Sequence, residues 1–220
     1  MLQLLLAAPS SGSGKTTAAT LIPRFWDVQE GSITIGGHDV KEFTCDSLLK
    51  NMSMVFQNVY LFKDTIENNI KFGCPEASHE QVVEAAKKAR CHDFISLLPE
   101  GYNTMIEEGG STLSGGEKQR VAIGSAIASD KKLLIFDEPT SGLDYRHMLE
   151  VSDNLNRLKE MGKSLFLITH DPELIYKCCT YLLFIQGSKV LWHRPMDGEA
   201  VKLLRAFFSH EQETGAVNAS

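Results

Sequence analysis

Short apolar runs alternate along the chain with segments in which apolar residues recur every three or four positions. The first pattern predicts buried strands and the second predicts amphipathic helices. Strands are predicted at residues 2–8, 32–35, 52–56, 133–136, 164–169, 181–186 and 189–193. Helices are predicted at residues 16–25, 81–98, 116–129 and 149–161. Strands that alternate with helices predict an α/β fold with a mostly parallel sheet.

Residues 58–128 contain little strand signal, and we expect a helical subdomain there. Within it, Ser78 stands three residues before Gln81, which is the spacing of a capping box at a helix start. Residues 1–57 and 129–209 then form the α/β core on either side, and the polar tail at 210–220 is expected to be flexible.

Composition narrows the class of protein. The 220 residues include 22 Lys and Arg against 28 Asp and Glu, a net charge of −6, so no nucleic-acid partner is expected. No apolar stretch approaches the ~20 residues that span a bilayer. The five cysteines are odd in number and form no Cys-x-x-Cys pair, which favours free thiols over a zinc site or a disulfide framework.

A Gly/Ser-rich segment separates the first predicted strand from the first predicted helix. It consists of Ser11, Gly12, Ser13, Gly14, Lys15, Thr16 and Thr17. In a phosphate loop the backbone N–H groups surround the phosphates, the Lys reaches the terminal phosphates, and the Thr hydroxyl binds Mg²⁺. Pro9 stands where the full pattern has its first Gly, so a simple Gly/Ser turn is the alternative interpretation.

Two carboxylates, Asp137 and Glu138, follow directly after the apolar run 133–136. Ligands of open α/β sheets bind at the carboxyl ends of the strands, which is where this pair is expected. Asp137 is then a candidate Mg²⁺ ligand, and Glu138 a candidate general base that activates a water. An ordinary helix N-cap is the alternative for an acidic pair in this position.

A second anion-binding helix start is predicted at Leu113-Ser-Gly-Gly-Glu117. With this segment, the chain resembles the ATP-binding cassette (ABC) ATPases. Ser114, Gly115, Gly116 and Glu117 resemble the signature motif of that family, and Gln57, Asp144 and His170 resemble its Q-loop, D-loop and switch residues. Taken alone, His170 could equally be a core histidine, and Gln57 a residue of a surface loop.

The resemblance implies a P-loop NTPase core and a head-to-tail dimer that binds ATP and Mg²⁺. Each ATP would lie between the phosphate loop of one subunit and residues 114–117 of the other, with Asp144 also contributing to nucleotide binding. Glu138, His170 and Gln57 would be catalytic, and Thr16, Gln57 and Asp137 would bind the metal. The implied partner is a transmembrane transporter subunit or domain, contacted near residues 59–69, which would hold the protein at the cytoplasmic face of a membrane.

The sequence departs from the family in two ways. The N-terminal antiparallel subdomain, which normally stacks an aromatic residue on adenine, is expected to be largely absent, leaving residues 31–35 near its usual position. Residues 56–70 and 106–112 also resemble exporter ATPases, whereas residues 137–144 and 169–173 resemble importer-type, energy-coupling-factor ATPases. A truncated or recombined scaffold with weak or no ATPase activity is therefore the alternative function.

Overall fold

The computed structural model describes residues 3–7, 15–186 and 189–217. Its centre is a six-stranded sheet in the order β10-β9-β1-β8-β7-β4. These strands are β1 (Gln3–Ala7), β4 (Met52–Val55), β7 (Leu133–Asp137), β8 (Ser164–Thr169), β9 (Tyr181–Gln186) and β10 (Lys189–Pro195). All neighbours pair in parallel except β9 and β10, which form the predicted antiparallel hairpin. The expected α/β fold with a mostly parallel sheet is confirmed, and the hairpin turn itself lies outside the described residues.

The inner strands are apolar throughout because both faces of the sheet are covered. Ile135 of β7 packs on one face with Ala19 of α1 (Lys15–Leu21). Its neighbours Leu134 and Phe136 point to the other face, whose core includes residues of α7 (Tyr145–Glu160) and α8 (Pro172–Cys178). This alternation explains why the run 133–136 has no polar position.

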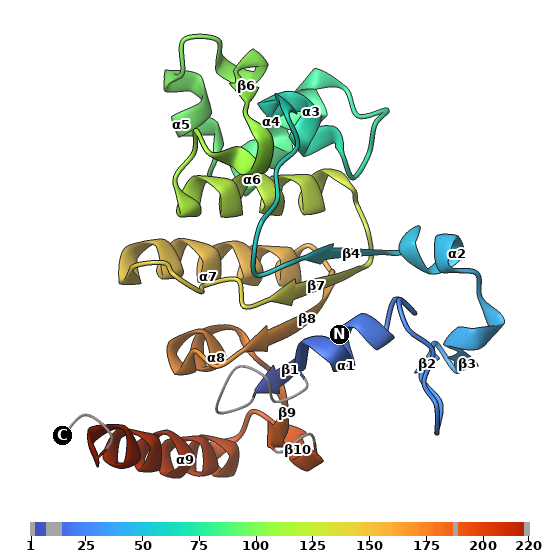
Figure 1. Cartoon of the computed structure of the whole chain (residues 1–220), viewed down its shortest axis with the longest axis vertical. Helices are drawn as coiled ribbons and strands as arrows, with labels where there is room; N and C mark the ends of the chain where they lie inside the picture. The colour runs from blue at the N-terminus through green and yellow to red at the C-terminus, as the bar shows by residue number, and fades with distance from the viewer. Residues whose placement is uncertain (1–2, 8–14, 187–188, 218–220) are drawn as a thin grey trace.

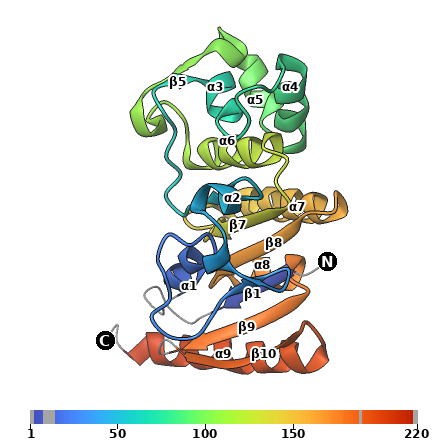
Figure 2. The same cartoon turned by 90° about the vertical axis from the view of Figure 1, so that its right-hand side faces the viewer.

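Four helices gather at one end of the molecule, away from the β9–β10 hairpin (Figures 1 and 2). They are α3 (Ile66–Lys71), α4 (His79–Lys88), α5 (His92–Leu97) and α6 (Gly115–Ala128). Two short strands, β5 (Asp64–Thr65) and β6 (Met105–Ile106), pair within the same region. At the opposite end, α9 (Gly198–Val217) lies beside the hairpin (Figure 1).

The segment between α1 and β4 holds the remaining elements. They are a two-stranded antiparallel sheet, β2 (Thr34–Ile35) with β3 (His38–Asp39), and the short helix α2 (Cys45–Leu49). Val40, Leu48 and Met52 form a small separate core there. This segment is thereby attached to the start of β4, which is an edge strand of the six-stranded sheet.

The single helix predicted over residues 81–98 is wrong, because two helices, α4 and α5, occupy this segment. The chain turns at Arg90, whose φ is +55°. The N–H of Cys91 bonds to the carbonyl of Ala86, and the N–H of Arg90 bonds to that of Lys87, which is the pattern of a Schellman C-cap. The sequence has no glycine at this helix end, and the apolar periodicity continues across it, so the periodicity predicted one helix instead of two. The capping box of Ser78 and Gln81 at the start of α4 is confirmed.

The two ends of the chain also differ from expectation. The helix α1 ends at Leu21 rather than at residue 25, because Pro23 follows and Arg24 takes a left-handed φ of +59°. The helix α9 continues through Val217, whereas the sequence predicted a frayed tail from residue 210. The segment Glu211-Gln-Glu213 consists of residues with high helix propensity, which favours that continuation.

Candidate active site

The carboxyl ends of β1, β8, β7 and β4 lie side by side at one edge of the sheet. The register aligns Val55 with Phe136, Asp137 with Ile168, and Ala7 with Thr169. The residues that follow these strands are therefore neighbours, although the sequence separates Gln57 from His170 by more than a hundred positions. This edge holds the candidate catalytic residues.

The predicted phosphate loop begins at this same edge. Its first part, Ser11, Gly12, Ser13 and Gly14, lies outside the described residues. Lys15, Thr16 and Thr17 are the first three residues of α1. The loop thus connects the end of β1 to a helix start, as the phosphate-loop interpretation requires.

Glu138 and His170 form a close pair at the ends of β7 and β8. The His170 Nδ1 lies 2.8 Å from Glu138 Oε1, and the backbone N–H of His170 donates to Glu138 Oε2 at 3.3 Å. An ionised carboxylate can only accept, so Nδ1 carries the proton and donates it. The Glu138 side chain is 9% exposed and that of His170 is 51% exposed, which leaves the imidazole open to a ligand.

The backbone at Glu138 is strained. Its φ of +48° is in the left-handed region that side chains other than glycine rarely adopt. A hydrogen bond from the Glu138 N–H to the Ile168 carbonyl, 2.8 Å long, fixes this conformation. Strain of this kind clusters at functional sites, where the surrounding structure holds a side chain in a required direction.

Asp137 ends β7 and is 3% exposed. Its carboxylate is a hard oxygen donor of the type that Mg²⁺ prefers. No cluster of three or more His, Cys, Asp or Glu side chains suited to a metal occurs within the described residues. These donors therefore fit an ion held by one or two side chains together with phosphate oxygens, and not an ion in an all-protein cage.

Gln57 and the segment after Glu138 contact each other. The Gln57 Nε2 donates to Ser141 Oγ at 3.2 Å, which joins the loop after β4 to the loop after β7. Thr140 Oγ1 likewise donates to Asp171 Oδ2 at 2.9 Å and joins the β7 loop to the residue after His170. Three loops that carry candidate residues are thus connected by side-chain hydrogen bonds.

Asp144 caps the N-terminus of α7. Its Oδ1 accepts the backbone N–H of His147 at 2.9 Å and lies 2.8 Å from His147 Nδ1. The backbone hydrogen bond, followed by the side-chain one, lowers the pKa of Asp144, so this carboxyl is ionised at neutral pH. Asp144 is accordingly an acceptor with a fixed orientation.

The signature-like segment forms the first turn of α6. Ser114 is the N-cap, and it exchanges hydrogen bonds with Glu117 in a capping box. A Cβ atom added at Gly116 would lie 3.2 Å from His147 Cδ2, so this turn abuts the first turn of α7. The structure therefore brings residues 114–117 next to the D-loop-like segment around Asp144.

Sequence reasoning missed three residues of this region. Ser141 and His147 bond to the candidate residues Gln57 and Asp144, and Asp171 joins two of the loops that carry candidate residues. Each of the three is an ordinary polar residue within its own stretch of chain. Only the spacing of His147 from Asp144, three positions into a helix, could have indicated its contact with the cap.

Comparisons with known proteins agree with this geometry. The family model described as "ABC transporter" matches residues 9–141. An ATP-dependent lipid A-core flippase of Legionella pneumophila is 46% identical over 214 residues, covering 94% of this chain and 35% of the flippase. The ABC transporter B family member 14 of Arabidopsis thaliana is 42% identical over 180 residues, covering 82% of this chain and 14% of that protein.

A solved structure of a bacterial Atm1-family ABC exporter with ATP bound superimposes with a TM-score of 0.83. It is 36% identical and covers 93% of this chain and 35% of the exporter. The chain thus spans about a third of the length of the flippases and the exporter that it matches. In the part of the chain that the structure describes, no helix is long and apolar enough to cross a bilayer. The fold and the relatives agree, and the chain belongs to the ABC transporter family as an ATP-binding ATPase domain.

Proposed function

We propose that this domain hydrolyses ATP at the strand edge that carries Glu138 and His170, and that hydrolysis drives transport through a membrane-spanning partner. The observation that carries the proposal is the hydrogen-bonded Glu138–His170 pair at the carboxyl ends of β7 and β8. Of these two strands, β8 pairs directly with β1, the strand that leads into the phosphate loop. Glu138 accepts the proton of the attacking water as general base. His170, whose imidazole is half exposed, contacts the γ-phosphate.

Asp137, Thr16 and Gln57 would hold Mg²⁺. All three offer oxygen donors, and Asp137 and Gln57 follow neighbouring strands of the sheet. A bound Mg²⁺ supplies positive charge that stabilises the phosphate oxygens in the transition state. Gln57 is exposed and hydrogen-bonded to Ser141, so it is free to change partner when nucleotide binds.

The second half of each nucleotide site comes from another ATPase subunit. Ser114, Gly115, Gly116 and Glu117 form a helix N-terminus whose N–H groups and dipole suit an anion. In the proposed dimer, this helix start faces the phosphate loop of the other subunit, residues 11–17. The same proposal includes a division of the chain into two parts. The core consists of residues 1–57 and 129–209, and the helical subdomain consists of residues 58–128 and contains the signature segment.

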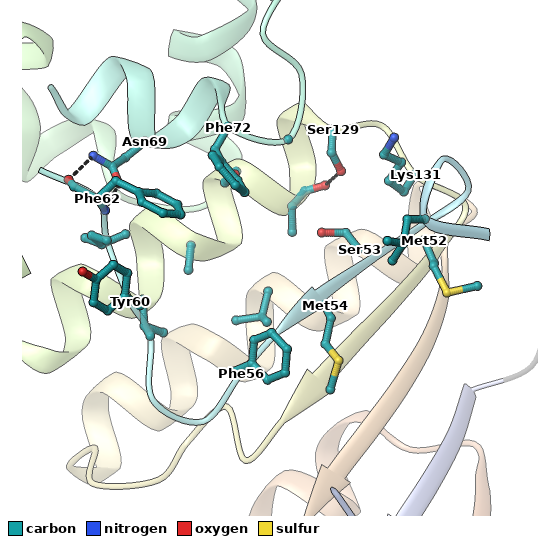
Figure 3. A pocket seen from close by; sticks show the side chains of 18 of the residues that line it. Met52, Ser53, Met54, Phe56, Tyr60, Phe62, Asn69, Phe72, Ser129 and Lys131 are labelled. Carbon is teal, nitrogen blue, oxygen red and sulfur yellow. Dashed lines mark hydrogen bonds between the residues drawn. The ribbon is translucent and has the colours of Figure 1, made fainter. Parts of the chain in front are cut away.

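A groove next to the helical region supports a membrane-spanning partner. Its volume is about 510 Å³, and it lies between β4 with the loop that follows and the helices α3 and α6 (Figure 3). Aromatic side chains line it and remain exposed, among them Phe56, Tyr60, Phe62 and Phe72. Phe62 stacks on Phe72 at 4.6 Å between ring centroids, and buried Asn69 fixes the backbone of Phe62 through two hydrogen bonds.

Apolar grooves of this kind accept an amphipathic helix. We propose that a cytoplasmic helix of the transporter partner occupies the groove, since the relatives carry about twice as much further sequence outside the matched part. The contact would place this domain at the cytoplasmic face of the membrane. It also connects the partner to Gln57, which directly follows Phe56 of the groove.

The substitution Glu138→Gln tests the catalytic assignment. The amide cannot accept the proton, so we expect turnover to fall by ~10²–10⁴-fold while ATP binding is retained. ATP-dependent dimers should also persist longer, because the nucleotide between the subunits is no longer consumed. Hydrolysis is measured by phosphate release and dimerisation by analytical ultracentrifugation. If Glu138→Gln hydrolyses ATP nearly as fast as the unmodified protein, the proposal is overturned. If the unmodified chain itself shows no turnover, the inactive-scaffold alternative is supported.

A pair of variants tests the shared nucleotide site. Lys15→Ala should weaken nucleotide binding by the monomer because it removes a charge from the phosphates. Ser114→Arg should leave monomer binding intact and prevent ATP-dependent dimerisation. An equimolar mixture of the two should form one intact composite site per dimer. Equal loss of monomer binding in both variants would contradict the head-to-tail arrangement.

A further inference from the structure

The first turn of α7 contains a histidine that none of the proposed catalytic steps uses. His147 is 39% exposed, and its Nδ1 lies 2.8 Å from Asp144 Oδ1. Because the Asp144 carboxylate can only accept, Nδ1 carries the proton and donates it. Asp144 Oδ1 thus accepts both the backbone and the ring N–H of His147. Since Asp144 itself is 66% exposed, these contacts are what orient its carboxylate.

The same imidazole ring lies against the signature-like turn of α6. Its Cδ2 atom is 3.2 Å from the position that a Cβ of Gly116 would take. That distance is shorter than ordinary van der Waals contact, so a side chain at position 116 would require the ring to move by a few tenths of an ångström. His147 therefore contacts two segments at once, the Asp144 carboxylate through Nδ1 and Gly116 through the ring edge.

A second contact one turn further along both helices supports this arrangement. Arg120 Nη1 donates to Glu150 Oε2 at 3.0 Å, and both side chains are largely buried, at 12% and 27% exposure. The Arg120 guanidinium also lies 5.3 Å from the ring centroid of Phe94 in α5. Arg120 is four residues after Gly116, and Glu150 is three after His147, so the two contacts lie on the same faces of α6 and α7.

We infer that His147 is a positioning residue that holds the Asp144 carboxylate in register with the signature segment Ser114–Glu117. The inference rests on the proposed function, in which both segments face the second subunit and its nucleotide. A misplaced carboxylate at that surface slows the reaction without weakening the phosphate contacts of the subunit's own loop. Loss of His147 should therefore lower kcat and leave KM for ATP nearly unchanged.

Three variants at this position separate positioning from stability. The Nδ2 of asparagine lies close to the place of His147 Nδ1, so His147→Asn keeps the hydrogen bond to Asp144. The Nε2 of glutamine lies one bond further out, so His147→Gln does not, and His147→Ala removes the donor. We expect kcat to fall about tenfold in His147→Ala and His147→Gln and less than threefold in His147→Asn, with KM within twofold throughout. A stabilising role alone predicts the opposite order, because glutamine has the higher helix propensity.

The matched control is His38→Ala, which removes an exposed histidine that lies 3.3 Å from Glu42. We expect its kcat and KM to stay within twofold of those of the unmodified protein. An unchanged kcat in His147→Ala, or a kcat of His147→Asn as low as that of His147→Gln, would overturn the inference. If the unmodified chain shows no ATP turnover, that result would instead contradict the proposed function.

The contact with Gly116 can be measured without nucleotide. Gly116→Ala should give a lower midpoint of urea unfolding, relative to its own background, when His147 is present than when it is absent, because the added methyl requires the ring to move. In the His147→Ala background the same change should raise the midpoint, since alanine favours the helix. An equal shift of the midpoint in both backgrounds would overturn the inference, whether or not the chain hydrolyses ATP.

Discussion

The helical region and the carboxyl-end edge of the sheet each contain a histidine bonded to a glutamate, and these two pairs differ in their surroundings. In the helical region, Glu67 of α3 lies 2.7 Å from His79 Nδ1 and 2.8 Å from Lys71 Nζ. At the edge of the sheet, Glu138 lies 2.8 Å from His170 Nδ1. The pair distances are nearly equal, but the surroundings of the two glutamates are not.

The backbone and the neighbours account for this difference. Glu67 belongs to a regular helix, a lysine one turn away compensates its charge, and the His79 ring packs edge-on against buried Tyr102 at 5.4 Å. Glu138 instead adopts a left-handed φ of +48°. Both histidines are about half exposed, at 55% for His79 and 51% for His170, so the backbone of the glutamate makes the difference and the exposure of the ring does not. The first pair joins α3 to α4 and stabilises the fold. In the proposed function the second presents its groups to the nucleotide, and the left-handed backbone at Glu138 is the strain that this placement requires.

The largest expected effect comes from removing one histidine from each pair. His170→Ala should lower kcat by about 10²-fold, because it removes the group that orients Glu138 and contacts the phosphate. His79→Ala should leave kcat within twofold of the unmodified protein, since it lies in the helical region. Steady-state phosphate release for the two purified variants makes the comparison. Similar losses of kcat would mean that the two pairs do not differ in function.

A second prediction concerns Glu67 and pH. Burial raises the pKa of Glu67, but hydrogen bonds from Lys71 and His79 outweigh it and hold that pKa below its usual range. Because the pKa of Glu67 is lower in the folded state, its carboxylate stabilises the fold at pH values above its unfolded pKa of ~4.3. This stabilisation is lost as the pH falls through the pKa of Glu67 in the folded protein.

Glu67→Gln should therefore lower the free energy of unfolding by about 1–3 kcal/mol at pH 7 and by much less near pH 3. Urea unfolding at both pH values measures the difference. Glu84→Gln is the control, because Glu84 is exposed and its bridge to Lys87 should contribute little at either pH. A loss that is equal at pH 7 and pH 3 would show that the charge of Glu67 is unimportant.

The smallest effect on stability compares two of the four non-glycine residues that have a left-handed φ, Arg90 and Glu138. Arg90 has a φ of +55° at the C-cap of α4, and its only described ion pair, with Asp153, is long at 3.8 Å. Arg90→Gly should relieve the strain and raise stability by about 0.5–1 kcal/mol without a change in kcat. Glu138→Gly relieves similar strain but should abolish turnover. Differential scanning calorimetry with parallel activity assays tests both variants, and a destabilised Arg90→Gly would refute the assignment of strain to that residue.

Much of the fold could be predicted from local patterns. The strand at residues 164–169 has the predicted bounds, and β7 extends the predicted 133–136 by one residue, because continuous apolar runs bounded by polar residues have few other solutions. The failures lie where no residue type marks the conformation. Arg90 ends α4 in a geometry that usually takes glycine, so the break between α4 and α5 depends on packing that periodicity cannot reveal.

The candidate site divides in the same way. The candidate roles of Asp137, Glu138 and residues 114–117 could be predicted from their own neighbours in the chain, because short motifs determine which groups follow a strand or open a helix. The candidate role of His170 depended on the resemblance to the family. The sequence by itself thus determined the elements, their apolar faces and the candidate functional groups. The tertiary structure alone decided which groups meet. The order of β4, β7, β8 and β1 brings Glu138 into contact with His170, and Gln57 into contact with Ser141. The packing of α6 on α7 places His147 next to Gly116. Such contacts depend on strand order and helix packing, which are set by the burial of the whole core and not by any single segment.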